Sequence, residues 1–220
     1  MSDARTAILG KVDRALRTAR IPALDEHVAG DPTVDAPKRP WREGGQASGR
    51  GELLTRFVVE ARTLGVDAYV ETTQEGVRDR LATIITGLRV SSWNPDQLPY
   101  GAGALVGGAA FGSSPRADQA AAEVGVTGCH GAIAETGSIA LLSGPGCSRV
   151  VSLLPPLHVA LIRPDDLFHG MGDFFAARAD RIANAASCTF VTGPSRTADI
   201  ELSLTIGVHG PGRVVIIVGP

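Results

Sequence analysis

The chain has 220 residues, a formal net charge of −2, 44% hydrophobic residues and 5% aromatic residues. This length suits one α/β domain with a sizeable core. The small number of aromatic side chains and the nearly balanced charge argue against a nucleic-acid-binding surface.

The three cysteines, Cys129, Cys147 and Cys188, are odd in number and widely spaced. We therefore expect neither a disulfide framework nor a metal or iron–sulfur cluster held by this chain. The longest apolar stretch, residues 150–162, is interrupted by two prolines and is too short to cross a bilayer. Because the first residues also lack the apolar core of a signal peptide, we expect a soluble, cytoplasmic protein with no membrane span.

The N-terminal region divides into two parts. Apolar residues recur at helical spacing from Ile8 to Ala19, which predicts an amphipathic helical arm over residues 1–24. Residues 25–50 are rich in proline and glycine and are predicted to form a linker without a core of its own. The main domain is expected over residues 51–220.

The main domain begins with alternating helices and strands. Helical spacing covers residues 53–64 and 77–88, with a capping box at residues 72–75 before the second helix. Short strands are predicted at residues 68–70 and 89–93. This order predicts a parallel sheet with right-handed crossovers, whereas the Gly-rich residues 94–113 fit no element.

The C-terminal half is predicted to be rich in strands. A short helix is expected from Pro115 to near Gly125, and a second helix over residues 165–185 with Leu167, Met171, Phe174, Phe175 and Ile182 as its buried face. Strands are predicted at residues 133–142, 150–154, 158–162, 188–191, 200–206 and 213–218. The whole pattern predicts a three-layer α/β/α domain with a mixed, largely parallel central sheet.

A first polar cluster interrupts an apolar run at Glu135, Thr136, Gly137 and Ser138. A carboxylate, two hydroxyls and a glycine could hold a small polar ligand against exposed backbone N–H groups. The alternative is a turn whose hydroxyls satisfy local backbone groups.

A second polar cluster follows a predicted strand. Ser195 or Thr197 could cap a helical turn whose N–H groups point at a carboxylate or phosphate, and nearby acidic residues could orient an arginine or a water. A capped turn with a surface ion pair is the alternative. The candidate ligand-binding residues are Gly193, Ser195, Arg196, Thr197, Asp199 and Glu201. We expect this cluster to converge with the first, because the strand ends of one sheet meet.

Other candidates stand alone in the sequence. Arg149 could bind a carboxylate with its planar guanidinium, although a solvated arginine at a strand end is an alternative. His158 begins an apolar strand, where a histidine satisfied within the core competes with a ligand-binding role. Histidine is the side chain best suited to proton transfer near neutral pH, so His209 and His130 are candidates, and a histidine in a turn is the alternative for His209.

Four segments resemble a known family when taken in order: residues 132–138, Arg149 with residues 152–155 and His158, residues 193–201 and residues 209–211. Together they are similar to the lactate-utilisation protein C family, whose shared module is called the LUD domain. The Ala- and Arg-rich N-terminal helix also resembles that family, so the resemblance extends over most of the chain.

The resemblance implies a fold similar to the sugar-phosphate isomerase and CoA-transferase group, with ligand-binding loops at strand ends. It also implies a role in the oxidation of L-lactate to pyruvate, together with partner proteins similar to iron–sulfur oxidoreductases. On this reading the chain carries no cofactor, the iron–sulfur clusters belong to its partners, and it binds a small carboxylate. The alternative is a stand-alone CoA-transferase- or isomerase-like enzyme acting on an acyl-CoA or phosphorylated substrate, with Glu135 as nucleophile or base; this rests on fold analogy.

Overall fold

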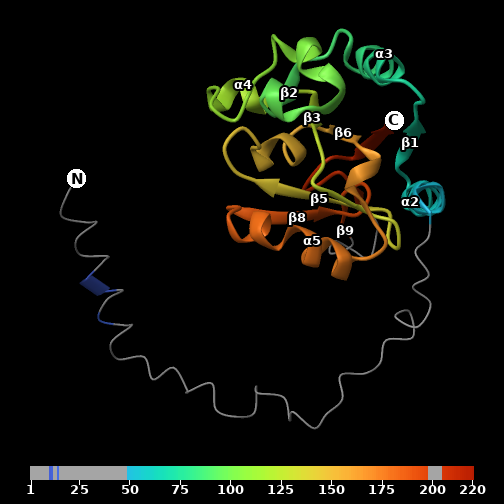
Figure 1. The fold of residues 1–220 in the computed structure, drawn as a ribbon. Coiled ribbons are helices and arrows are strands. Elements are labelled where there is room, and N and C mark those ends of the chain that lie inside the picture. Colours follow the sequence, from blue (N-terminus) through green and yellow to red (C-terminus); the bar gives the residue numbers. More distant parts are fainter. Residues whose placement is uncertain (1–9, 12–13, 15–48, 198–204) are drawn as a thin grey trace. The chain divides into compact units, whose positions relative to one another are not determined.

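Two β-sheets packed face to face form the centre of the domain (Figure 1). The computed structural model describes residues 10–11, 14, 49–197 and 205–220. The chain divides into two units, Met1–Gln46 and Ala47–Pro220, and both sheets belong to the second. Most of the predicted arm and linker therefore lies outside the described residues.

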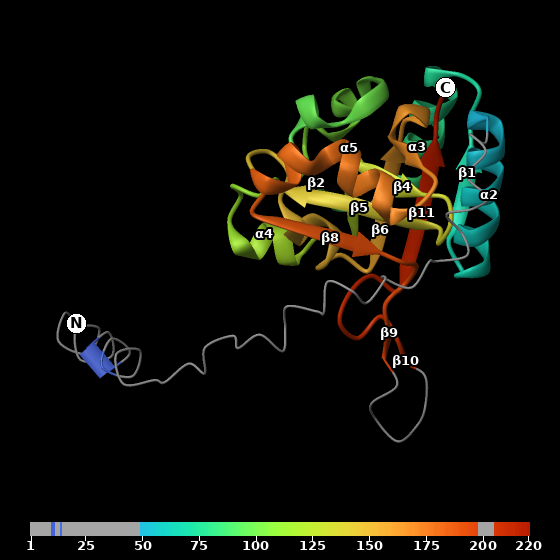
Figure 2. The ribbon, with the colours of Figure 1, turned by 60° about the horizontal axis from the view of Figure 1, so that its bottom comes forward.

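The first sheet is entirely parallel. Its strands, in spatial order, are β1 (Asp67–Val70), β11 (Arg213–Val218), β6 (Leu157–Ile162), β3 (Val124–Thr127) and β2 (Val90–Ser92). The expected parallel central sheet is thus confirmed. The two strands nearest the N-terminus lie at its opposite edges, because the later strands β11, β6 and β3 lie between them (Figure 2).

The second sheet is mixed. Its order is β7 (Leu167–Phe168), β4 (Gly131–Ile133), β5 (Ser138–Ser143) and β8 (Ser187–Val191), with β7 parallel to β4 and the other pairs antiparallel. A short antiparallel ribbon, β9 (Arg196–Thr197) with β10 (Thr205–Ile206), extends from the sheets (Figure 2). The α/β class is confirmed, but the strands predicted to share one mixed sheet are divided between two.

The predicted strand at residues 133–142 is in fact a hairpin. Its turn falls at residues 134–137, where Gly137 has φ +64°, a conformation that other residues rarely adopt. The prediction was wrong because the apolar residues on both sides of the turn are buried, so the sequence reads as one buried strand although it forms two.

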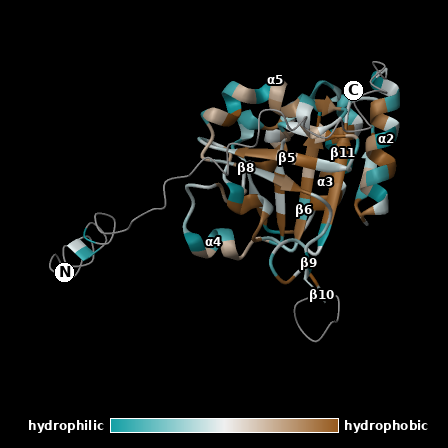
Figure 3. Cartoon of the chain, turned by 90° about the horizontal axis from the view of Figure 1, so that it is seen from below, coloured by the Kyte–Doolittle hydropathy of each residue, from teal (hydrophilic) through white to brown (hydrophobic). Residues whose placement is uncertain are grey.

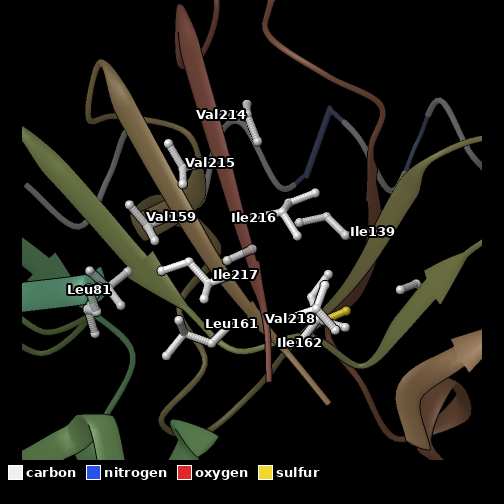
Figure 4. Packing of buried hydrophobic residues seen from close by; sticks show 14 of the residues in the cluster. Leu81, Ile139, Val159, Leu161, Ile162, Val214, Val215, Ile216, Ile217 and Val218 are labelled. Atoms are coloured by element: carbon white, nitrogen blue, oxygen red, sulfur yellow. The ribbon is translucent and has the colours of Figure 1, made fainter. Parts of the chain in front are cut away.

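The alternating side chains of the strands separate the layers. On one face of the parallel sheet, Leu161 and Ile217 lie with Leu81 of the helix α3; on the other face, Ile216 lies near Ile139 of β5 (Figure 4). The next residue of β5, Ala140, belongs to the cluster around Phe174 of α5 instead. The order of layers is therefore α3, parallel sheet, mixed sheet and α5.

Within residues 49–197 and 205–220, four α-helices flank the sheets: α2 (Arg50–Thr63), α3 (Gln74–Ile85), α4 (Arg116–Ala120) and α5 (Met171–Ala183). The capping box predicted before α3 is correct only in its threonine cap. Thr73 Oγ1 accepts a 2.9 Å hydrogen bond from the Gly76 amide, and Gly76 has no side chain to complete a box. The helices carry more hydrophilic residues than the strands between them (Figure 3). The predicted buried face of α5 is wrong in part, because Met171 and Phe175 are 39% and 45% exposed.

Four 3-10 helices complete the described elements: η2 (Pro95–Gln97), η3 (Pro99–Val106), η4 (Arg149–Ser152) and η5 (Pro164–Asp166). The first two occupy the Gly-rich segment that fitted no predicted element. The strand predicted at residues 150–154 is wrong, since η4 occupies this position and Val151 is fully buried. A Cβ at Gly125 of β3 would overlap the carbonyl oxygen of Val151. The chain therefore passes over β3 at a point where the strand has no side chain.

We predict that Gly125→Ala destabilises the domain by about 3 kcal/mol or more, because the new methyl group must displace the backbone at Val151. Urea denaturation measures the change. The control is Gly107→Ala, where φ is −59° and a Cβ meets no atom within 4 Å, and it should stay within about 1 kcal/mol of the wild type. Equal stability of the two variants would contradict the close approach.

Candidate functional site

Thr192, which directly precedes the second polar cluster, lies beside Ser138 of the first cluster. Because β5 and β8 are antiparallel neighbours with Ile139 opposite Val191, the start of one strand lies beside the end of the other. The hydroxyls of Ser138 and Thr192 are 2.8 Å apart, and Thr136 Oγ1 donates to Ser138 Oγ, also at 2.8 Å. The three hydroxyls therefore form one chain of hydrogen bonds.

Backbone of α2 packs closely against both clusters. A Cβ at Gly137 would overlap the Ala61 nitrogen, and one at Gly193 would lie 3.1 Å from the Leu64 Cβ. The Arg196 guanidinium donates to the Leu64 carbonyl oxygen at the end of this helix. These contacts account for the two glycines by packing, and ligand binding by this region stays a prediction.

Glu135 lies at the N-terminal end of α5. Its amide donates to the His169 carbonyl oxygen at 3.0 Å, and its Oε2 would lie 3.0 Å from a Cβ at Gly170, the residue that caps α5. A carboxylate at the start of a helix stabilises it by roughly 0.3–1 kcal/mol. This position gives Glu135 a structural explanation, independent of catalysis.

The remaining described residues of the second cluster lie where the parallel strands begin. The Ser195 amide donates to the Pro211 carbonyl oxygen just before β11, and the Ser195 carbonyl accepts from Gly207. Thr197 belongs to β9, and His209 is exposed in the loop between β10 and β11. The candidates Asp199 and Glu201 lie outside the described residues.

His158 is fully buried between the two sheets. Its Nε2 lies 2.9 Å from Thr127 Oγ1, and its Nδ1 has no hydrogen-bond partner. Burial lowers the pKa of His158 from 6.5 to about 4, so the imidazole is neutral at pH 7. These surroundings fit a core histidine better than a base that exchanges protons with substrate.

Arg149 lies far along β5 from both clusters, past the Ser143 end of that strand. It lines a cavity of about 610 Å³ beside Asn94, two residues after the carboxyl end of β2. Ligands of open α/β sheets bind outside the carboxyl ends of the strands. The lining residues are Asn94, Gly112, Ser113, Ser143, Gly144, Gly146, Cys147, Ser148, Arg149, Ala186 and Ser187.

A tight turn over residues 144–147 forms one wall of this cavity. Pro145 and Gly146, with φ +75° at the glycine, suit the two central positions of a type II turn. The turn is held by the Asn94 amide, which donates to the Gly146 carbonyl at 2.9 Å, and by Trp93 Nε1, which donates to the Ser148 carbonyl at 3.1 Å. The wall of the cavity is therefore fixed by backbone acceptors.

The chemistry of the cavity suits a small anion. Arg149 is exposed and has no ion pair or side-chain hydrogen bond within the described structure. Besides Arg149, the described lining of the cavity contains four serines and one asparagine, and it contains no acidic side chain. A guanidinium surrounded by neutral hydrogen-bonding groups can bind a carboxylate without competition from a protein carboxylate.

The cysteines are poorly suited to nucleophilic chemistry. Burial raises the pKa of the Cys129 thiol to about 12 and that of Cys147 to about 11, so both are thiols at pH 7. Among the described residues, no three His, Cys, Asp or Glu side chains are grouped so that they could hold a metal ion.

One known family matches the part of the chain that contains Arg149. The LUD domain family matches residues 109–218, half of the chain, which include the Arg149 turn and both polar clusters. The chain belongs to the LUD domain family. The matched region contains every residue that lines the Arg149 cavity except Asn94. The predicted family resemblance is confirmed.

Similar proteins include several called lactate utilization protein C. The one from Exiguobacterium sp. is 32% identical over 190 residues, covering 80% of this chain and 81% of that protein. The one from Halalkalibacterium halodurans is 40% identical over 103 residues, and the match spans only 44% of its length. A crystal structure of a DUF162 family protein from Deinococcus radiodurans is 25% identical with a TM-score of 0.63, covering 79% of this chain and 99% of that one.

Sequence reasoning on this LUD domain missed most of the cavity. It singled out Arg149 but not Asn94 or Ser113, which lie in the Gly-rich segment left without an element. A polar residue soon after a predicted strand was the available signal for Asn94. The predicted likeness to sugar-phosphate isomerases and CoA transferases stays a prediction. No helix within the described residues is both long and apolar enough to cross a membrane.

The buried histidine gives a testable pH dependence. Between pH 6.5 and about 4 the unfolded chain binds a proton at His158 that the folded domain does not, so the free energy of unfolding falls as the pH falls. We predict that His158→Gln reduces this slope by up to roughly 1.4 kcal/mol per pH unit. Urea denaturation at several pH values measures the slope, and the same slope in both proteins would show that folding does not lower the pKa of His158.

Proposed function

We propose that this chain acts in L-lactate utilisation, binding a small carboxylate in the Arg149 cavity and working with partner proteins that hold iron–sulfur clusters. Oxidation of L-lactate to pyruvate removes two electrons and two protons. The chain supplies the carboxylate site, and the partners' clusters accept the electrons. The names of the similar proteins support the process, and the cavity supports the binding role.

The unpaired guanidinium of Arg149 is the observation that carries the binding role. An exposed arginine usually gains little from a surface ion pair, but here it stands beside a cavity of about 610 Å³ with four hydroxyl side chains. Hydrogen bonds to a charged group contribute about 1.5–3 kcal/mol. The carboxylate of lactate or pyruvate can accept from the guanidinium while its hydroxyl or carbonyl oxygen is bound by the serines.

The stand-alone enzyme is the weaker reading. It requires Glu135 to attack a substrate, whereas the Glu135 carboxylate lies beside Gly170 at the start of α5. Turnover of a CoA thioester or sugar phosphate by the purified chain, lost in Glu135→Gln, would favour that reading over the assembly.

A genetic experiment tests the process. A strain lacking the gene should lose growth on L-lactate, keep growth on pyruvate, and regain the former with the wild-type gene. A tagged chain should co-purify with iron–sulfur proteins from cells grown on L-lactate. Normal growth of the deletion strain on L-lactate would refute the role.

We predict that Arg149→Gln weakens the binding of pyruvate and L-lactate in the Arg149 cavity about 10- to 100-fold, because the charged donor is lost. Isothermal titration calorimetry on the full chain measures the affinity. Arg116→Gln is the matched control, since Arg116 is also exposed and lies outside the cavity. Equal weakening in both variants would indicate a nonspecific charge effect and contradict the Arg149 site.

A further inference from the structure

A second cavity, of about 360 Å³, adjoins the residue 144–147 turn from a different side. It shares Ser143, Gly144 and Cys147 with the Arg149 cavity, and its other walls come from η2 and the C-terminal part of α5. Its lining residues are Gln97, His130, Leu142, Ser143, Gly144, Pro145, Cys147, Asp180, Arg181, Asn184 and Ala185. None of the sequence predictions for the ligand site includes its α5 residues.

His130 is held rigidly in the wall of this second cavity. The residue is only 8% exposed, and its ring lies 5.2 Å from that of Trp93. Its own amide donates to the Ala140 carbonyl, and its carbonyl accepts from Arg178 Nε. Main-chain and ring contacts together fix the direction of the imidazole.

The hydrogen bond at Nδ1 determines which ring nitrogen carries the proton. The Leu142 amide donates to His130 Nδ1 at 3.1 Å. A backbone N–H can only donate, so Nδ1 must present its lone pair. The neutral imidazole therefore carries its proton on Nε2.

That Nε2–H donor is available to a ligand. No hydrogen bond of His130 Nε2 occurs within the described structure. In the part of the chain that the structure describes, the fully enclosed side-chain atoms without a partner are Ser91 Oγ and His158 Nδ1, so Nε2 of His130 is not sealed from solvent. A buried side chain thus presents one unused donor at the cavity.

Burial and the positive charges nearby keep the His130 ring neutral. Arg178 is engaged by Asp166 at 2.9 Å, while Arg181 in the cavity wall has no ion pair or side-chain hydrogen bond among the described residues. Burial, followed by Arg181, Arg178 and Arg163, lowers the pKa of His130 to about 4. Protonation would also break the bond from Leu142. The imidazole is therefore a fixed donor and cannot act as a base at pH 7.

We propose that this second cavity is a separate binding site for a small carboxylate, in which His130 Nε2–H donates to a ligand oxygen and Arg181 neutralises its charge. Gln97 and Asn184 supply amide groups at the same cavity. Asp180 also lines it and sets a limit on how many negative charges it accepts, which favours a monocarboxylate such as an oxo acid over a phosphate ester. The site does not depend on occupation of the Arg149 cavity.

Imidazole NMR of the full chain with ¹⁵N-labelled histidine tests this proposal, with pyruvate as the probe. His130 should show a neutral ring with its proton on Nε2 at pH 7, and pyruvate should shift that resonance in a saturable way. Arg181→Gln should weaken this titration about tenfold or more, since it removes the charged partner and leaves the buried ring in place. His130→Phe assigns the resonance.

The controls separate this site from its neighbour. Arg116→Gln and Arg149→Gln should both leave the His130 titration unchanged. A proton on Nδ1, no shift of His130 with pyruvate, or equal affinity in Arg181→Gln would overturn the proposal. A shift lost in Arg149→Gln but kept in Arg181→Gln would also overturn it, by placing the carboxylate in the first cavity.

Discussion

The close approach of η4 to β3 is the constraint on which the rest of the domain depends. After β5 the chain must return to the start of β6, and it does so between the two sheets, with the Val151 backbone lying over Gly125. Backbone can pass this close to a strand only where no Cβ projects from it. This passage places the turn at residues 144–147 beside the carboxyl end of β2, and hence determines where both cavities form.

The arginines around the residue 144–147 turn differ in whether they have a partner. Arg178 donates to Asp166 and to the His130 carbonyl, so it links α5 to η5 and to the residue before β4. Arg149 and Arg181 remain without partners within the described structure, one at each cavity. Leaving two guanidinium groups unpaired beside polar cavities gains little for folding, since solvated charges contribute little stability. Binding of anions at the two proposed sites would give this arrangement a function.

The structure also changes the meaning of the two clusters that the sequence made most prominent. The hydroxyls of Thr136, Ser138 and Thr192 satisfy one another, and Gly137 allows β5 to begin against α2. A role in packing does not conflict with the family resemblance that these residues carry. Residues that define a fold can be as characteristic of a family as residues that bind a ligand. Glu135 also has a structural role, because its carboxylate lies at the start of α5.

The sequence by itself determined the local elements: the amphipathic spacing of α2 and α3, the cap at Thr73, and the apolar strands β6 and β11. These depend on periodicity and on neighbours along the chain. Only the tertiary structure decided that the strands divide between two sheets, that residues 149–152 form a 3-10 helix in place of a strand, and that His130 lines a cavity with Arg181. Each of these depends on contacts between segments distant in sequence, such as Val151 on Gly125, and apolar patterning does not say which buried segment packs on which.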